Sequence, residues 1–338
     1  MEQINFQNEL DNVKKPVWSV IDSYLPKSNS DHHKMIRDYP ERQGKYFRPA
    51  LVLWSAKMFG EKSSKALLTA AAMQLSEDWL LTHDDFLDHS LERRHLPSLN
   101  ALHGDELAVN AGDALHLVMW KVIGNNAKIL KNSGWKIYEK FYEILATTLE
   151  GQFLEVSWIK NKKINITENE YYNLIDIKAG LYTVVGPIEL GALVAGAGKE
   201  IKKIKSWGIP FGRAFQIWDD VMNVSVSADI QGKENGGDIL EGKRTILLIH
   251  LLRNCAKKEK DAINAIYLKK REEKSEQEKN YIISLMEKYG SIGYAKKKAE
   301  YFSRRAGMDF DKEYSRLPRS KEKEMIRESI NFVINRKK

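Results

Sequence analysis

The sequence predicts an all-α fold, in which one large helical domain covers residues 1–338. Of the 338 residues 43% are hydrophobic, so the chain can bury a large core. No proline stands between Pro97 and Pro187 or between Pro210 and Pro318, and long helices need such stretches. No alternating apolar run is long enough to predict a sheet. Apolar residues instead recur at helical spacing, for example at Ile137, Phe141, Ile144, Leu145, Leu149 and Phe153.

Along the chain, the first strong element is the apolar segment Lys65–Thr82, which predicts a buried helix. Two stretches are loop-like, namely Asp88–Gly104 around a proline and the glycine-rich Val226–Glu241. The charged Lys257–Lys279 region interleaves Lys with Glu and predicts a long surface hairpin. Because no Ser/Gly/Pro-rich linker divides the chain, we expect one domain.

The net charge of +8 arises in the C-terminal part of the chain, where residues 256–338 hold 23 Lys/Arg against 14 Asp/Glu. Such a region can attract nucleic acid, an anionic membrane or an anionic substrate. Here the basic residues alternate with Glu, a pattern typical of a solvated helix face. We therefore expect no nucleic-acid partner, and the terminal Arg336-Lys337-Lys338 is expected to be a solvated end.

Neither a targeting segment nor a membrane span is expected. Met1–Lys15 lacks the apolar core of a signal peptide. The nearly uncharged stretch Tyr182–Gly198 is interrupted by Pro187 and Glu189, and it falls short of the roughly 20 apolar residues that a bilayer span requires. Cys255 is the only cysteine, which favours a reducing compartment. These features predict a cytoplasmic protein.

The first group of residues suited to chemistry is His83-Asp84-Asp85-Phe86-Leu87-Asp88. Asp84 and Asp88 are four residues apart and project from one helix face. Two such carboxylates repel each other unless a cation lies between them, and Mg²⁺ accepts oxygen ligands of this kind together with phosphate oxygens. Arg93 and Arg94 follow, with forked guanidinium groups suited to phosphate. The motif alone is equally compatible with a surface cluster of ion pairs.

A second acidic motif, Phe215–Asn223, ends another apolar helical run. Its Asp219 and Asp220 would face the first motif across a cavity, and two opposed acidic faces would hold a cluster of metal ions. Lys233 and Lys243 follow in and after the glycine-rich loop and would supply positive charge for phosphate. Such an array suits the binding of a diphosphate that is to leave, which two unrelated surface clusters would not explain.

Four shorter motifs, in order along the chain, complete the pattern: Gly44–Pro49 (Gly-Lys-Tyr-Phe-Arg-Pro), Asn110–Asp113, Gly151-Gln152 and Lys178-Ala179-Gly180. Together with the aspartate motifs they resemble the trans-isoprenyl diphosphate synthases, the polyprenyl synthetase family of farnesyl and geranylgeranyl diphosphate synthases. The resemblance is strongest over residues 43–243. It implies helices around a deep central apolar cavity and a homodimer, for which the apolar face of Leu107–Val122 could serve.

The resemblance also implies roles for individual residues. The Mg²⁺-binding residues would be Asp84, Asp85, Asp88, Asp219 and Asp220, for three ions per site. Contacts to the diphosphate of the allylic substrate would come from Arg93, Lys178, Gln216, Lys233 and Lys243. Isopentenyl diphosphate would be bound by Lys45, Arg48, Glu77 and Arg94. The floor of the product tunnel, below the first aspartate motif, would be formed by Trp79 and Leu80.

The implied activity is Mg²⁺-dependent prenyl transfer, in which isopentenyl diphosphate condenses head-to-tail with dimethylallyl, geranyl or farnesyl diphosphate through an allylic carbocation. No enzyme nucleophile takes part; cationic groups would stabilise the departing diphosphate. A bulky floor at Trp79 predicts a short product. Asn223, in place of the last Asp of the second motif, favours geranylgeranyl over farnesyl diphosphate.

Other departures from the family pattern leave alternatives open. Glu77 stands where His or Gln is usual, and its carboxylate would repel a diphosphate unless it were protonated or held by Lys45 or Arg48. Ala179 replaces a Thr, and His95 replaces a Gly without a physical explanation. Glu77 and Ala179 favour a non-catalytic or regulatory subunit of a heteromeric synthase. A class I terpene cyclase is a further alternative, but it would have no use for a second diphosphate site.

Overall fold

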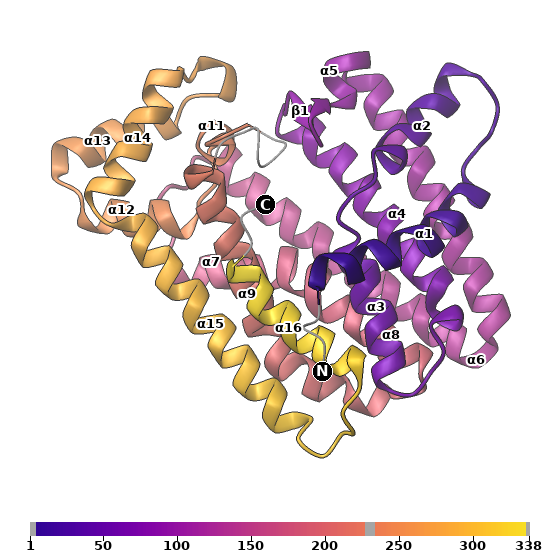
Figure 1. The fold of residues 1–338 in the computed structure, drawn as a ribbon. Coiled ribbons are helices and arrows are strands. Elements are labelled where there is room, and N and C mark those ends of the chain that lie inside the picture. The colour runs from indigo at the N-terminus through magenta and orange to yellow at the C-terminus, as the bar shows by residue number, and fades with distance from the viewer. Residues whose placement is uncertain (1–4, 227–233, 336–338) are drawn as a thin grey trace.

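The computed structural model describes residues 5–226 and 234–335, so Lys233 and Arg336-Lys337-Lys338 lie outside the described residues. Within these ranges the molecule is a bundle of helices (Figure 1), and the only strands are β1 (Glu92–Arg93) and β2 (Leu96–Pro97), which pair antiparallel. The prediction of an all-α fold is confirmed.

The helical elements of the described residues are α1 (Phe6–Tyr24), α2 (Asp31–Arg42), α3 (Phe47–Met58), α4 (Ser63–Leu87), α5 (Leu99–His103), α6 (Asp105–Lys160), α7 (Glu168–Ile175), the π-helix η1 (Asp176–Val185), α8 (Gly186–Val194), the 3₁₀ turn η2 (Gly198–Glu200), α9 (Ile201–Ser225), α11 (Gly237–Glu241), α12 (Ile246–Asn254), α13 (Lys257–Tyr267), the 3₁₀ turn η3 (Arg271–Glu273), α14 (Glu276–Lys288), α15 (Ser291–Glu313) and α16 (Lys321–Asn335). Helix α6 is interrupted at Lys131, whose φ is 52°.

Both segments expected to be loops contain short elements. Asp88–Gly104 includes β1, β2 and α5, and the Ser98 hydroxyl caps α5 by accepting a hydrogen bond from the Ala101 amide at 3.4 Å. Val226–Glu241 includes α11, which follows Gly236 in a left-handed conformation (φ 70°). Elements of two to five residues are too short for a hydrophobic period to indicate them.

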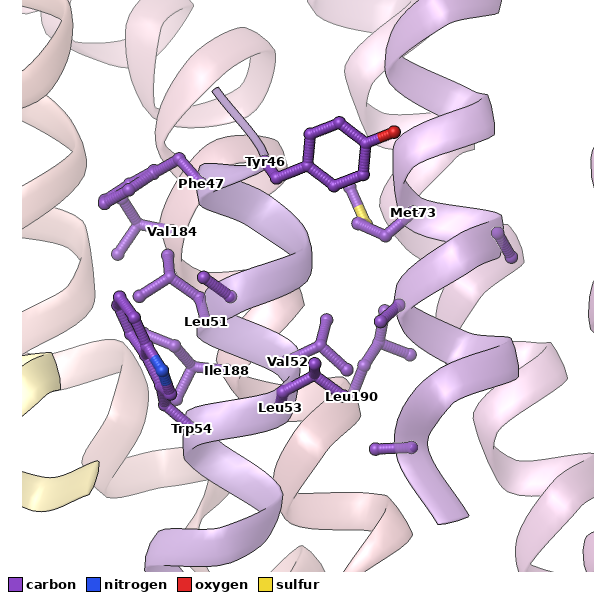
Figure 2. Packing of buried hydrophobic residues seen from close by; sticks show 14 of the residues in the cluster. Tyr46, Phe47, Leu51, Val52, Leu53, Trp54, Met73, Val184, Ile188 and Leu190 are labelled. Atoms are coloured by element: carbon purple, nitrogen blue, oxygen red, sulfur yellow. The ribbon is translucent and has the colours of Figure 1, made fainter. Parts of the chain in front are cut away.

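Helix α3 lies at the centre of the larger core cluster. Between Arg48 and Lys57 it has no charged residue, and its residues 49–56 are buried. Figure 2 shows Leu51 and Val52 of α3 together with Met73 from α4 and Ile188 from α8. A helix without a polar face must be enclosed by its neighbours. This enclosure fixes the first turn of α3, which carries Arg48.

A second core cluster gathers apolar faces of α9, α12, α14 and α15, with Ile217, Leu248 and Ile282 fully buried. Helix α9 contributes to both clusters, and Trp218 and Ile334 pack against both. The second aspartate motif therefore ends a helix that is held along most of its length.

The stretch Glu168–Val194, which spans α7, η1 and α8, is long and apolar enough to cross a membrane, since it contains an 18-residue window with a mean hydropathy of 1.4. In the structure 72% of this 18-residue segment is buried inside the bundle. A core helix of a globular protein has the same composition, so its place in the bundle explains its hydropathy.

The charged Lys257–Lys279 region forms the surface hairpin predicted for it, with α13, η3 and the start of α14 at one corner of the molecule (Figure 1). Arg271 of η3 forms an ion pair with Glu234 and lies 3.4 Å from Glu241 of α11. The Lys274 ammonium donates a hydrogen bond to the Leu240 carbonyl at 2.5 Å. The hairpin is therefore attached to α11.

Candidate active site

A cavity of ≈ 220 Å³ opens where the C-terminal ends of α4 and α9 meet α6, η1 and α11. Acidic side chains outnumber basic ones on its wall. The acidic residues are Asp84, Asp88, Glu92, Glu155, Asp219, Asp220, Glu234, Asp238 and Glu241, and the basic residues are Arg93, Lys178, Lys243 and Arg244. The two aspartate motifs thus meet at one cavity, as the sequence predicted.

Asp84 and Asp88 reach the cavity from the end of α4. The Gln152 amide donates a hydrogen bond to Asp84 at 3.1 Å, and the Lys178 ammonium lies 3.9 Å away. Burial opposes ionisation of Asp84, but the charges of Lys178, Lys243 and Arg93 lower its pKa to about 2. Burial instead raises the pKa of Asp88, against the effect of Lys243 at 2.9 Å. The pair therefore differs in its ease of ionisation.

Asp85 is not among the residues that line the cavity, and it is fully buried. The Tyr39 hydroxyl donates a hydrogen bond to one carboxylate oxygen at 2.6 Å, and the Arg93 guanidinium donates to both oxygens. Asp85 therefore orients Arg93, whose side chain lines the cavity.

The second motif is built in a similar way. Asp219 lines the cavity from the last turns of α9. Asp220 lies deeper: the Tyr171 hydroxyl donates to it at 2.7 Å and the Gln216 amide at 2.9 Å. Burial and the neighbouring Asp238 carboxylate raise the pKa of Asp220. Gln216 also lines the cavity.

Each of the cavity lysines already holds carboxylates. The Lys178 ammonium pairs with Glu155 of α6. The Lys243 ammonium lies 2.9 Å from Asp88, 3.7 Å from Asp238 and 2.5 Å from Glu241. Burial opposes the charge of Lys243, but these carboxylates raise its pKa, so it stays protonated. Lys243 links α4 to α11 across the cavity.

The position of Lys178 depends on two close backbone approaches. A Cβ added to Gly151 of α6 would lie 2.7 Å from the Lys178 Cβ, and a Cβ added to Gly212 of α9 would lie 2.4 Å from the Gly180 Cα. Only glycine permits such contacts between helices. The wide turns of η1 carry Lys178 between these helices, and π-helical turns often mark functional sites.

The residues expected to bind isopentenyl diphosphate form a separate group, outside the wall of this cavity. Arg48 and Glu77 form an ion pair at 3.0 Å, while Lys45 is exposed. Arg94 donates to the buried Asp78 at 2.7 Å and to the Tyr39 carbonyl at 2.6 Å. Of the two possibilities considered for Glu77, its retention by Arg48 is the one seen in the structure.

Trp79 and Leu80 also lie off the wall of this cavity. The Trp79 ring is buried and stacks on the His116 imidazole of α6, with ring centroids 4.0 Å apart and planes 17° apart. The His116 Nε2 accepts a hydrogen bond from the Trp120 indole at 2.6 Å. Helix α6 therefore packs aromatic side chains against Trp79.

Sequence reasoning missed the roles of Tyr39 and Tyr171, and it named Gln152 without assigning it a partner. Tyr39, Tyr171 and Gln152 contact the aspartate motifs, but 46, 49 and 68 residues separate them from those partners. Tyr171 precedes Lys178 by two helical turns and Glu155 follows Gly151 by one, so helical spacing alone could have indicated both.

The residues present fit a divalent cation that arrives with its substrate. Among residues 5–226 and 234–335, no three His, Cys, Asp or Glu side chains are close enough to hold a metal ion by themselves. Mg²⁺ needs only one or two carboxylates when phosphate oxygens and waters supply its other ligands. Asp84, Asp88 and Asp219 offer such oxygens on a wall with excess acidic side chains. These three would hold it.

Comparison with known proteins identifies the family. The polyprenyl synthetase family model matches residues 30–286. The chain belongs to the polyprenyl synthetase family. Among other members, the geranylgeranyl diphosphate synthase of Sulfolobus acidocaldarius is 30% identical over 306 residues, 89% of this chain and 90% of that protein. The geranylfarnesyl diphosphate synthase of Aeropyrum pernix is 28% identical over 302 residues, 87% of this chain and 91% of that protein.

The fold agrees with solved structures of polyprenyl synthetases. The geranylgeranyl pyrophosphate synthetase from Pyrococcus horikoshii matches with a TM-score of 0.85 and 28% identity, over 99% of this chain and 100% of that one. The resemblance noted from the motifs is thereby confirmed. Polyprenyl synthetases generally use Mg²⁺, in agreement with the acidic wall of this cavity.

Proposed function

We propose that this polyprenyl synthetase is a catalytically active short-chain prenyltransferase. It condenses isopentenyl diphosphate, the acceptor, with dimethylallyl, geranyl or farnesyl diphosphate, the allylic substrate. The observation that carries this proposal is the meeting of both aspartate motifs with Arg93, Lys178 and Lys243 at one cavity. A regulatory subunit would not need this complete set of charged groups.

The cavity is the allylic half of the site. Arg93, Lys178, Gln216 and Lys243 bind the diphosphate. The proposal assigns the same role to Lys233, which lies outside the described residues. Asp84, Asp88 and Asp219 would hold Mg²⁺, three ions per site in this proposal, while Asp85 and Asp220 hold neighbouring groups in place. When bound, Mg²⁺ supplies positive charge that neutralises the leaving diphosphate.

Two lysines of the protein also neutralise the negative charge of the leaving diphosphate. Lys178 and Lys243 exchange their carboxylate partners for phosphate oxygens, so positive charge is already placed where negative charge develops. Ala179 supplies no hydroxyl to face the developing carbocation, and the backbone carbonyl of Lys178 remains available for that role. The allylic cation then alkylates the acceptor double bond, and a proton passes to the released diphosphate.

The acceptor half of the site comprises Lys45, Arg48, Glu77 and Arg94. Trp79 and Leu80 form the floor of the product tunnel. The imidazole of His116 stacks on Trp79 and so supports this floor from α6. A closed aromatic floor favours a short product, geranylgeranyl or farnesyl diphosphate, and Asn223 supports the former.

Assembly and location follow from the same proposal. Residues 1–338 act as one domain, since Trp218 and Ile334 join both core clusters. Helix α6 exposes several large apolar side chains, as expected for a homodimer interface. They are Leu107, Leu117, Ile129, Trp135, Tyr142, Leu149 and Phe153. The enzyme is placed in the cytoplasm, where its single Cys255 stays reduced.

A product assay tests the function. The purified chain is incubated with Mg²⁺, labelled isopentenyl diphosphate and one allylic diphosphate at a time, and the dephosphorylated alcohols are sized. We expect one dominant product of the geranylgeranyl or farnesyl class. Absence of incorporation from every allylic substrate, in a chain that is folded by circular dichroism, would favour the regulatory subunit.

A further inference from the structure

The acceptor half of the site carries its own carboxylates. Glu77 and Asp78 are neighbours on α4, and each pairs with a different arginine. The Arg48 guanidinium lies 3.0 Å from Glu77, with side chains 18% and 17% exposed. The Arg94 guanidinium lies 2.7 Å from Asp78, whose side chain is 1% exposed. Both arginines are therefore neutralised in low-dielectric surroundings, where charges act strongly on each other.

Further contacts fix the guanidinium of Arg48. It donates to the Thr183 hydroxyl at 2.9 Å and lies 4.6 Å above the Tyr182 ring. Thr183 and Tyr182 belong to η1, so three elements hold Arg48 in place. Arg48 cannot swing away from Glu77 without losing these contacts, and an incoming anion must therefore bind beside the carboxylate.

Unsatisfied polar atoms in the same place indicate that a ligand belongs there. The Arg48 Nε and the Tyr46 hydroxyl are buried and have no hydrogen-bond partner in the described structure. Buried donors normally have a partner, and both of these could serve an anion. Asp78, Arg94 and Glu77 act electrostatically on Tyr46, so its hydroxyl is close to Arg94 and to both carboxylates.

The balance of charge limits which anion fits. Lys45, Arg48 and Arg94 bring three positive charges, and Glu77 and Asp78 remove two. An anion bound beside the Arg48–Glu77 pair is repelled by the Glu77 carboxylate, and this repulsion grows with the charge of the anion, so Glu77 weakens a diphosphate more than a monophosphate.

We propose that Glu77 sets the charge selectivity of the acceptor site, by weakening the binding of a diphosphate relative to a monophosphate head group. The inference rests on the proposed function, because that function makes Arg48 and Arg94 the acceptor half of the site. Glu77 is a specificity-determining residue, and the allylic half of the site is unaffected by it.

The test compares isopentenyl diphosphate with isopentenyl monophosphate in the wild type and in Glu77→Gln and Glu77→Asp. Glu77→Gln keeps the shape and removes the charge, so we expect the Kd and KM for the diphosphate to fall roughly tenfold. The values for the monophosphate should fall much less, and the KM for the allylic substrate should not change. Glu77→Asp keeps the charge and should retain wild-type selectivity. Asp22→Asn, which breaks the distant pair with Arg37, is the matched control.

Calorimetric Kd values separate this inference from the function on which it rests. If no variant transfers a prenyl group but Glu77→Gln still tightens diphosphate binding selectively, the function fails and the charge selectivity stands. If Glu77→Gln changes both head groups equally, or if Glu77→Asp behaves like Glu77→Gln, charge selection by Glu77 is wrong. Thermal unfolding of each variant identifies any that fails to fold, and Glu77→Ala then repeats the comparison.

Discussion

The buried hydroxyl of Tyr171 donates a hydrogen bond to Asp220 at 2.7 Å. The same relation occurs across the cavity, where Tyr39 donates to Asp85 at 2.6 Å. In each aspartate motif the second carboxylate is thus held by a tyrosine from another helix. The first carboxylates, Asp84 and Asp219, line the cavity, as Asp220 does, whereas Asp85 does not.

Removal of the Tyr171 hydroxyl should therefore weaken the binding of the metal ion more than it destabilises the fold. We expect Tyr171→Phe to lower kcat/KM roughly tenfold or more, because Asp220 loses a buried hydrogen-bond donor. The Mg²⁺ concentration for half-maximal activity should rise, and Mn²⁺ binding measured by electron paramagnetic resonance should weaken. The control is Tyr172→Phe, whose hydroxyl contacts Glu168. Equal metal dependence in both variants would contradict the prediction.

Truncation of Trp79 should lengthen the product. In Trp79→Ala the indole no longer fills the space against His116, so the prenyl chain can extend past α4. The loss of a buried Trp costs about 3–5 kcal/mol of stability, and the variant must be assayed below its lowered Tm. Chromatography of the dephosphorylated alcohols measures the result, with Trp18→Ala on α1 as control. An unchanged longest product would remove Trp79 as the floor.

The stability of the protein should depend on pH through Asp78. Burial raises the pKa of Asp78 from 3.8 to about 6, although Arg94 opposes the shift. The folded state thus favours the protonated acid, and the stabilisation is complete below pH 3.8 and is lost as pH rises through 6. Over this pH range the free energy of unfolding of the wild type should fall by about 3 kcal/mol relative to that of Asp78→Asn. Urea unfolding of both proteins at several pH values measures this difference. If the free energies of unfolding of the two proteins changed in parallel with pH, the prediction would be wrong.

A charge on the exposed face of α6 should disrupt the homodimer. Leu117 is 69% exposed, and Leu117→Glu would place a carboxylate in the proposed interface. We expect sedimentation velocity to show monomers at concentrations where the wild type is dimeric. Met308→Glu makes the same change at a 66% exposed site on α15 and should leave the dimer intact. A monomeric wild type would refute the interface itself.

The fold class and the aspartate motifs could be predicted because both depend on residues that are close together in the sequence. Proline-free apolar periodicity indicates helices, and Asp84 and Asp88 share a helix face whatever surrounds them. The resemblance to the polyprenyl synthetases then implied that Lys178 and Lys243 would join them, and the cavity contains both.

The partners of these residues could not be predicted in the same way. The contact of Tyr39 with Asp85 and that of Arg94 with Asp78 depend on how α2 and the turn after β1 dock against α4. Such contacts follow from packing between distant segments, and no local period encodes them. For Glu77 the sequence left two alternatives, a protonated carboxyl group or an ion pair with a basic residue. The packing of α3 against α4 brings Arg48 to Glu77 and forms the ion pair.

The attachment of the α13–α14 hairpin to α11 also has a dynamic consequence. With five residues, α11 is too short to be stable alone, and Arg271 and Lys274 hold it from outside. If the hairpin opens, α11 loses its support and Lys243 loses Glu241. The backbone amides of α11 and α14 should then exchange with deuterated solvent as one cooperative unit. Local unfolding at the corner of the molecule would in this way reach the cavity wall.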